Sequence, residues 1–478
     1  MLRGKMELGL SYDDVLLVPK RSPIKSRKDV STETYLTKKI KLKIPVVSSN
    51  MDTVTESGMA IEIAQLGGIG IIHRFNTIEQ QIKEVERVKR YRSALIERPL
   101  IVKYSSTLEE AREIMDEKGI TSLLVVDGKG KLTGILTARD IRFKPPLDTK
   151  VSELMTPKEK LVVGKKGISP EEAKNMMMKS KVEKLPVVDN DWNICGLYTG
   201  KDIYRKTKHP DSTVDSKDRL MVGAAVGVKE DAIQRAKKLV EAGADVLVID
   251  IAHGHSDLEI DVLKKIKKEL PDIEIIAGNV ATAEGTKDLI EAGADAVKVG
   301  VGPGSICTTR IVTGSGYPQL SAVMNCAKEA AKHGIPVIAD GGIKFSGDIT
   351  KAIAAGASTV MLGSLLAGTD ESPGDPIIKN GKKFKVIRGM ASFGAKFGRD
   401  AKEKTSTEIM EFVPEGVEAT VPYKGNVSEI VHQLMGGLRS GMSYCGAMTI
   451  KEVQEKGEFV RITSAGLKES HAHDVNLV

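Results

Sequence analysis

The sequence predicts an α/β protein built on a (β/α)8 barrel, with a smaller unit inserted into the chain. Short β-branched runs recur along the chain, and each is followed by polar loop residues and then a helical stretch. One segment of the first half repeats itself, which indicates a separate unit. The length of 478 residues exceeds the ~250 residues typical of a barrel and leaves room for this insertion.

Residues 1–94 contain the first part of the barrel. Apolar runs predict strands at Asp14–Val18, Ile44–Ser48 and Gly67–Ile72, with a helix over Ser57–Leu66. This alternation of strand and helix is typical of a parallel sheet whose faces are covered by helices.

Residues 208–478 return to this rhythm and contain the second part of the barrel. Glycine ends a helix just before a strand at Glu241–Asp245, Glu291–Asp295 and Ala354–Ser358. No G-x-G-x-x-G motif follows a strand here, so a dinucleotide-binding sheet of the Rossmann type is not expected. Five strands are predicted, which with the three above approach the eight of a closed barrel: Asp245–Ile249, Ile273–Ala277, Ala296–Val299, Pro336–Ala339 and Thr359–Leu362.

The middle segment, residues 95–207, is an internal repeat. One copy includes Gly119–Ile141 and the other Lys181–Ile203, and both read as helix, VVD strand, polar hairpin and second strand. The copies span about 95–145 and 151–207. The pattern resembles a tandem pair of cystathionine-β-synthase (CBS) modules, which often bind adenine or guanine nucleotides. The resemblance implies ATP or GTP as a ligand, and a packing module without a ligand remains the alternative.

Composition narrows the possible partners and the compartment. The net charge of +7 is dispersed and aromatic residues make up only 4%, so no nucleic-acid partner is expected. No apolar run is long enough for a transmembrane helix, and no signal peptide begins the sequence. The four cysteines form no CxxC pair. A cytoplasmic protein with reduced thiols is therefore predicted.

One of these thiols stands out as a candidate nucleophile. Cys307 lies in a loop with three glycines, directly after the predicted strand Ala296–Val299. Glycine-rich loops expose backbone amides that attract anions, which favours a thiolate. Cys195, Cys326 and Cys445 instead lie within strand or helix patterns, so they are expected to be structural.

Two later loops predict phosphate and ribose contacts. Asp340 and two glycines follow one strand, and Gly363 and Ser364 follow the next. Loops after the last strands of a barrel commonly bind phosphate, and a carboxylate there can accept hydrogen bonds from ribose hydroxyls.

These segments together resemble the IMP dehydrogenase and GMP reductase family over nearly the whole chain. The resemblance rests on SYDDVLLVP, MDTVTE, DIAHGHS, AGNVAT, the Cys307 loop, IADGGI, RGM, PEG and ESHAHD. It implies an oxidoreductase in which Cys307 bonds covalently to purine carbon 2 and NAD or NADPH serves as cofactor. IMP, GMP or XMP would be its substrates and products.

The resemblance also assigns site residues. Cys307, Thr309 and Glu415 are implied in catalysis. Ser305, Asp340, Gly342, Gly363 and Ser364 would hold the ribose and phosphate, Gly389, Met390 and Glu415 the base, and Asp250, Asn279 and Gly300 the cofactor.

A potassium ion and a subunit interface are implied as well. Carbonyl oxygens of Gly302, Gly304 and Cys307 would bind the ion, because loop carbonyls suit a hard cation. Glu469, Ser470 and His471 would complete the site from a neighbouring subunit. A homotetramer or a dimer of tetramers is therefore expected.

The predicted mobile flap, about 391–416, bears on the reaction. Dehydrogenases of the family activate water with an Arg-Tyr pair in this flap, whereas this flap has no tyrosine and Arg399 as its only arginine. Arginine is a base only when neutral, and Asp400 beside it would favour the charged form.

Asn50 and the HRF segment at His73 also favour a reductase that converts GMP and NADPH to IMP, ammonia and NADP. The alternative is IMP dehydrogenase, which forms XMP and NADH from IMP, NAD and water. A third hypothesis is a nucleotide sensor without catalysis.

Overall fold

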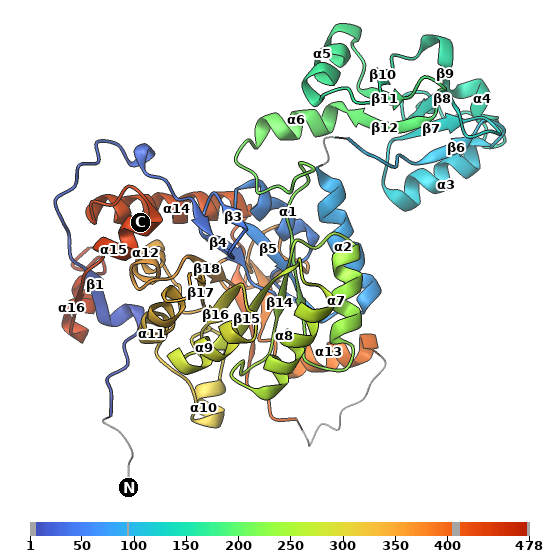
Figure 1. Cartoon of the computed structure of the whole chain (residues 1–478). Helices are drawn as coiled ribbons and strands as arrows, with labels where there is room; N and C mark the ends of the chain where they lie inside the picture. Colours follow the sequence, from blue (N-terminus) through green and yellow to red (C-terminus); the bar gives the residue numbers. More distant parts are fainter. Residues whose placement is uncertain (1–5, 93–94, 404–411, 476–478) are drawn as a thin grey trace. The chain divides into compact units, whose positions relative to one another are not determined.

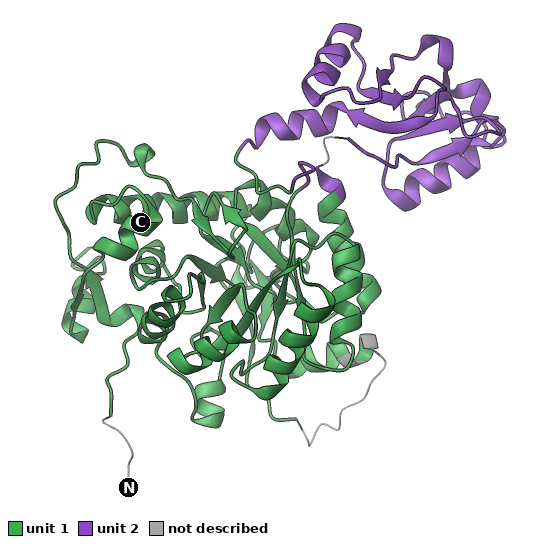
Figure 2. Ribbon diagram, in the orientation of Figure 1, with its two compact units in different colours: residues 1–89, 211–215, 220–478 green, residues 90–210, 216–219 purple. Residues whose placement is uncertain are grey.

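The chain divides into two compact units in a computed structural model (Figure 2). The first unit comprises residues 1–89, 211–215 and 220–478, and the second comprises residues 90–210 and 216–219. The structure describes residues 6–92, 95–403 and 412–475. None of the described helices is long and apolar enough to cross a membrane.

The first unit is built on a closed parallel barrel surrounded by helices (Figure 1). The order of its strands is β13-β14-β15-β16-β17-β18-β4-β5. The predicted (β/α)8 fold is therefore confirmed. The strands are β4 (Val46–Ser48), β5 (Ile69–Ile72), β13 (Gly223–Val226), β14 (Val246–Ile249), β15 (Glu274–Val280), β16 (Ala296–Val299), β17 (Val337–Asp340) and β18 (Thr359–Leu362). The main covering helices are α1 (Ser57–Gln65), α2 (Ile78–Tyr91), α7 (Ala232–Glu241), α8 (Asp257–Glu269), α9 (Ala283–Glu291), α11 (Gln319–Ala331), α12 (Ser346–Ala354) and α14 (Val427–Tyr444).

One predicted barrel strand was wrong. The run at Asp14–Val18 forms β1 (Val15–Leu17), which pairs antiparallel with β22 (Phe459–Arg461) outside the barrel. Val15 is buried while Leu16 is exposed, whereas barrel strands are buried on both faces. The missing barrel strand is β13, whose Gly-Ala-Ala-Val sequence is too poor in β-branched residues to predict a strand.

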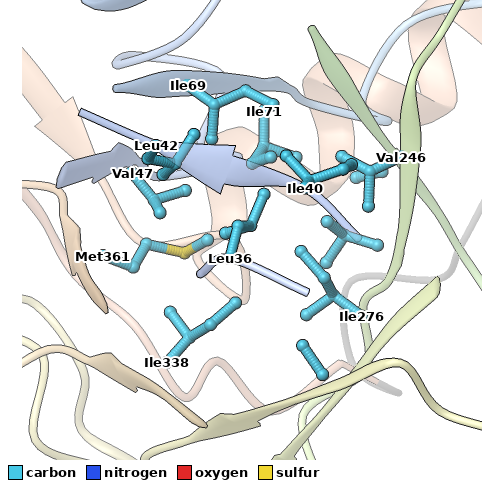
Figure 3. Packing of buried hydrophobic residues seen from close by; sticks show 13 residues of the cluster. Leu36, Ile40, Leu42, Val47, Ile69, Ile71, Val246, Ile276, Ile338 and Met361 are labelled. Atoms are coloured by element: carbon cyan, nitrogen blue, oxygen red, sulfur yellow. The ribbon is translucent and has the colours of Figure 1, made fainter. Parts of the chain in front are cut away.

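A hairpin of the N-terminal segment contributes to the barrel core. Its strands are β2 (Thr34–Tyr35) and β3 (Lys41–Leu42), which pair antiparallel. Leu36, Ile40 and Leu42 are buried in one cluster with side chains of the barrel strands (Figure 3). Complete burial of each such side chain contributes about 1.5–3 kcal/mol. The cluster comprises Leu36, Ile40, Leu42, Val47, Ile69, Ile71, Ala225, Val246, Val248, Ile276, Ala296, Ile338 and Met361.

A buried lysine lies at the amino end of the barrel strands. The Nζ atom of Lys89 is 2.9 Å from a carboxylate oxygen of Asp245 and 2.9 Å from one of Asp215. It also donates to the carbonyl of Leu220 at 3.0 Å. Asp245 directly precedes β14, so this ion cluster ties α2 to the entrance of that strand.

The second unit contains the repeat seen in the sequence. Helices α3 (Leu108–Lys118) and α5 (Pro170–Ser180) both end at a left-handed residue, Gly119 and Lys181. The two hairpins are β7 (Ser122–Val126) with β8 (Leu132–Thr137), and β11 (Lys184–Val188) with β12 (Ile194–Thr199).

The two copies of the repeat pack on each other. A bridge joins Lys131 to Asn193, and Leu124 and Leu132 of the first copy share a buried cluster with Val188 and Leu197 of the second. The sequence repeat is thus a structural repeat.

Candidate active site

The Cys307 loop follows β16 at the carboxyl end of the barrel, where barrel enzymes bind their ligands. Its backbone requires glycine at Gly300, which has a φ of +149° and lies against the backbone of Asp340. A Cβ at Gly300 would lie 2.2 Å from the Asp340 carbonyl oxygen. The loop that presents Cys307 is therefore packed directly against the end of β17.

Cys307 begins a chain of hydrogen bonds. Its thiol donates to the hydroxyl of Thr309 at 3.2 Å, and this hydroxyl donates to Oε2 of Glu415 at 2.8 Å. Glu415 is held in place because its carbonyl accepts the Thr308 N–H at 2.8 Å. The structure thus brings together the three residues predicted to be catalytic, although 106 positions separate Thr309 from Glu415.

The residues predicted to contact the base lie beside this chain. Gly416, next to Glu415, forms a bridge with Cys307, and its Cα would be 3.1 Å from a Cβ at Gly389. The neighbouring Met390 accepts a hydrogen bond on Sδ from the backbone N–H of Asp52 at 3.4 Å. Gly389, Met390 and Glu415 therefore converge on the cysteine loop.

A buried ammonium group connects three further strand ends. Lys298 on β16 is 2% exposed, and its Nζ atom lies 3.0 Å from Oδ2 of Asp340 and 3.8 Å from Oδ1 of Asp250. It also donates to Oδ1 of Asn279. Burial alone would lower the pKa of Lys298, but the charges of Asp340 and Asp250 outweigh burial and the pKa lies above its ordinary value.

Asn279 is fixed from both ends of its amide. Its Nδ2 donates to the carbonyl of Gly300 at 2.8 Å and to Oδ2 of Asp340 at 2.9 Å, while its Oδ1 accepts from Lys298. The predicted nucleotide residue Asp340 and the predicted cofactor residue Asn279 therefore belong to one network. Sequence reasoning missed Lys298, for which a lone lysine inside the apolar strand Ala296–Val299 was the available signal.

A second residue missed from the sequence is Glu259 of α8. Its side chain is fully buried, and Oε1 accepts the Gly278 N–H at 2.7 Å. Among the described residues, Oε2 has no hydrogen-bond partner. Burial raises the pKa of Glu259 to about 8, against the opposing effects of the Gly278 hydrogen bond and the charge of Lys298.

The guanidinium groups of two arginines lie over the aromatic ring of Phe75, and one of them is close to Asp250. Arg74 lies 5.1 Å and Arg399 5.6 Å from the ring centre of Phe75, and Nε of Arg74 is 3.5 Å from Oδ2 of Asp250. Burial lowers the pKa of Arg74, while Asp250 opposes this shift. Arg399 belongs to α13 (Phe393–Glu403) and is buried. The side chain of Asp400 and residues 404–411 of the predicted flap lie outside the described residues.

The loop after β17, predicted to bind the ribose and phosphate, contains two glycines in the left-handed region. Gly341 and Gly342 have φ values of +89° and +80°, which only glycine adopts readily. After β18, the carbonyl of Ser364 accepts a hydrogen bond from Lys424 at 3.2 Å, and burial lowers the pKa of this lysine. Ser305 is exposed on the Cys307 loop.

The residues predicted to bind potassium lie in two places. Gly302 and Gly304 belong to the Cys307 loop, where the Gly304 carbonyl accepts the Cys307 N–H at 3.1 Å. Glu469 ends α16 (Ser464–Glu469), Ser470 caps it, and the His471 ring lies 6.2 Å from that of Phe345. Among the described residues, no group of three or more His, Cys, Asp or Glu could hold a metal ion.

Cys307 and Thr309 follow strand β16, and Asp250 and Asp340 lie at the ends of β14 and β17, on the face where barrel enzymes place their chemistry. The family model described as "IMP dehydrogenase / GMP reductase domain" matches residues 9–473. The chain belongs to this family, and it is therefore an NAD(P)-dependent oxidoreductase of purine nucleotide metabolism.

Individual relatives carry both activities in their names. An inosine-5'-monophosphate dehydrogenase of Nitrosopumilus maritimus is 54% identical over 98% of this chain and 99% of its own. A GMP reductase of Leishmania major is 52% identical over 98% of this chain and 97% of its own. Among solved structures, a cysteine-to-alanine variant of Trypanosoma brucei GMP reductase in complex with guanosine 5'-monophosphate matches with a TM-score of 0.94. Its sequence is 51% identical, and the match covers 98% of this chain and 99% of that one.

Proposed function

We propose that this enzyme is a GMP reductase, which converts GMP, NADPH and a proton to IMP, ammonia and NADP. The observation that carries the proposal is the flap, which has no tyrosine and whose only arginine, Arg399, is buried against Phe75. An aromatic face stabilises the charged form of a guanidinium that lies over it. An arginine that takes a proton from water must instead be neutral. The flap therefore lacks the Arg-Tyr pair by which dehydrogenases of the family activate water, although an Asp, Glu or Lys of the flap could take that role, which keeps the dehydrogenase as the alternative.

The hydrogen-bonded chain from Cys307 suits the first half of this reaction. The Cys307 sulfur would bond to carbon 2 of GMP as the amino group leaves from the same carbon. A proton must reach the departing nitrogen, and the hydroxyl of Thr309 can relay it with the carboxyl group of Glu415 at 2.8 Å. The products of this step are ammonia and a covalent thioimidate on Cys307.

The second half returns the thiolate. The nicotinamide cofactor supplies a hydride to carbon 2 when it is bound, and the carbon–sulfur bond then breaks. Asp250 and Asn279 would orient the nicotinamide in this proposal, and their position at adjacent strand ends supports it, because a carboxylate and an amide suit a carboxamide group. Water must be excluded meanwhile, since hydrolysis of the thioimidate would give XMP.

The nucleotide is held by loops from several strands in this proposal. Asp340 accepts from the ribose, and Gly342, Gly363 and Ser364 with Ser305 contact the ribose and phosphate. The positive φ values of Gly341 and Gly342 support this role, because turns of this kind can direct backbone N–H groups at an anion.

A potassium ion and an oligomer complete the proposed site. Carbonyls of Gly302, Gly304 and Cys307 would bind the ion together with residues 469–471 of a neighbouring subunit. A tetramer or an octamer in the cytoplasm is expected, with activity that depends on potassium. A monomer in light scattering at micromolar concentration would contradict a shared site.

IMP dehydrogenase is the second candidate. The similarity to the Nitrosopumilus maritimus enzyme favours it, since that relative covers nearly the whole chain. The Cys307–Thr309–Glu415 chain is compatible with both reactions.

The two candidates are separated by measuring both reactions with one preparation. The absorbance at 340 nm is followed with GMP and NADPH and, separately, with IMP and NAD, and XMP is quantified by chromatography. We expect sustained NADPH oxidation with GMP, and with IMP at most one burst of NADH per active site. Sustained XMP formation faster than GMP reduction would establish the dehydrogenase instead. No nucleotide-dependent change with either pair would favour a sensor.

A further inference from the structure

Lys298 is a charged side chain in a place where a charge is costly. It projects from the buried strand β16, and only 2% of its surface is exposed. Transfer of an unpaired ammonium group into such surroundings costs several kcal/mol or more. Partners in direct contact offset this cost. The role of the charge can therefore be inferred from the residues that Lys298 contacts.

The partners of Lys298 come from three neighbouring strand ends. Asp250 follows β14, Asn279 lies in β15, and Asp340 ends β17. These are the residues for which a role in orienting the cofactor or the nucleotide is proposed above. One ammonium group thus contacts residues proposed for both ligands.

The contacts also leave a free acceptor on Asp340. Among the described residues, both hydrogen bonds to its carboxylate, from Lys298 and from Asn279, fall on Oδ2. The other oxygen, Oδ1, is left to accept from a ligand, and the side chain is 21% exposed. Lys298 therefore orients the carboxylate without blocking it.

We propose that Lys298 is a positioning residue that couples the nucleotide site to the nicotinamide site. Its charge holds Asp340 in the orientation that receives the ribose and, through the same amine, holds Asn279 and Asp250 for the cofactor. The inference rests on the proposed roles of Asp340 and Asn279. It holds for GMP reduction and for IMP oxidation alike, because both need a nucleotide and a nicotinamide in one geometry.

The kinetic test replaces Lys298 by methionine, which has a similar shape and no charge. We expect Lys298→Met to raise KM for the nucleotide and for the cofactor together, and to lower kcat by about 100-fold, since a misplacement of ~1 Å has this effect. Lys298→Arg, which keeps the charge, should recover part of the loss. Equal KM values and a kcat within threefold of the unmodified enzyme would overturn the proposal.

Lys89→Met is the matched control. Lys89 is also buried and also pairs with two aspartates, but at the amino end of the barrel. It should lower the melting temperature without a change in either KM. If Lys89→Met reproduces the kinetic pattern of Lys298→Met, the effect is one of general stability and the proposal is wrong.

A double-mutant cycle tests, without turnover, the interaction by which Lys298 positions Asp340 for the nucleotide. GMP and IMP binding is measured by calorimetry for Lys298→Met, Asp340→Asn and the double variant, all in a Cys307→Ala background. Interacting residues give non-additive losses, so Lys298→Met should weaken binding when Asp340 is present and have little effect when it is absent. Additive losses would overturn the proposal. Coupling without GMP reduction would remove only the proposed reaction direction.

A folding failure is also decisive. Lys298→Gln, which keeps a donor for Asp340 but no charge, replaces Lys298→Met in the cycle if the latter is insoluble. Failure of both variants to fold, with Lys89→Met folded, would assign Lys298 a structural role instead.

Discussion

The two ends of the barrel carry similar charged groups with different consequences. At the amino end, Lys89 and Asp245 are 4% and 12% exposed, and the amine is enclosed by two carboxylates and a carbonyl. At the carboxyl end, the side chain of Lys298 is 3% exposed, whereas that of Asp340 is 21% exposed. The carboxylates of the first cluster are nearly enclosed, whereas that of Asp340 is partly exposed at the end of the barrel where barrel enzymes bind their ligands.

Burial distinguishes the residues expected to act on stability from those expected to act on turnover in this fold. The amino-end pairs tie a helix and the strand entrances together, and the carboxylate of Asp245 also accepts the Val222 N–H at 2.8 Å. Substitutions there should act on the free energy of unfolding. Substitutions at the carboxyl end should act on turnover, as expected for the face where barrel enzymes place their chemistry.

The largest effect is expected for Cys307→Ala. Removal of the proposed nucleophile should lower turnover by about 10⁴-fold or more, because the proposed reaction forms its thioimidate on this sulfur. Nucleotide binding should survive, which calorimetry with GMP checks. Cys326→Ala is the control, since Cys326 is buried and burial raises the pKa of its thiol to about 11. Activity of Cys307→Ala within tenfold of the unmodified enzyme would exclude the nucleophilic role.

A smaller loss is expected when the proton relay is broken. Thr309→Val removes the hydroxyl between the thiol and Glu415, and a relay of this kind contributes about 10²–10⁴-fold. We expect kcat for GMP to fall within this range with little change in nucleotide affinity. Thr308→Val is the matched neighbour, since Thr308 contacts Glu415 through its backbone N–H. Equal rates for both variants would show that no proton passes through Thr309.

The carboxyl end also shows where prediction from sequence succeeds and fails. Strands such as Ala296–Val299 and Thr359–Leu362 were predicted with the bounds they have in the structure, because β-branched runs between glycines are distinctive. Gly223–Val226 was missed, since small residues give no such pattern.

Contacts between side chains of different barrel strands could not be predicted from the sequence, because they form only when the barrel is folded. Lys298 and Asp340 are 42 positions apart, and they meet only because β16 and β17 are neighbours in the barrel. A lysine in an apolar run does not indicate its partners in the sequence. Cys307, by contrast, is predicted as the nucleophile from the sequence itself, because its loop is local and rich in glycine.

The buried carboxyl group of Glu259 predicts a moderate effect on stability that depends on pH. Its pKa is about 8 in the folded protein and 4.5 when unperturbed, so folding favours the protonated form. The associated stability is fully present below pH 4.5 and is lost as the pH rises through 8. Glu259→Gln stays neutral, so at pH 9 it should be more stable than the unmodified protein by roughly a few kcal/mol, because each tenfold change in a protonation equilibrium corresponds to about 1.4 kcal/mol.

Urea denaturation at pH 5, 7 and 9 measures this difference. Glu269→Gln on the same helix is the control, because Lys237 lowers the pKa of Glu269 and its titration falls below this range. A stability difference between Glu259→Gln and the unmodified protein that does not change with pH would contradict a buried neutral carboxyl group.

The smallest effect on turnover is expected from removal of the second unit. The entrance and exit of this unit lie together, since Arg92 donates to the carbonyl of His209 at 3.1 Å and Arg205 lies 3.7 Å over the ring of Tyr91. A short glycine-serine linker can therefore replace residues 95–207 without strain on the barrel. All residues of the proposed active site belong to the first unit, so kcat and KM should stay within about threefold, the scatter expected for a change that touches no catalytic contact.

If the repeat binds ATP or GTP, as its resemblance to CBS modules implies, either nucleotide should change the activity of the full chain but not of the shortened one. Activity and nucleotide response are measured in the same assay at 340 nm. An insoluble or inactive product would show that the barrel depends on the second unit, and an unchanged nucleotide response would place the regulatory ligand on the barrel itself.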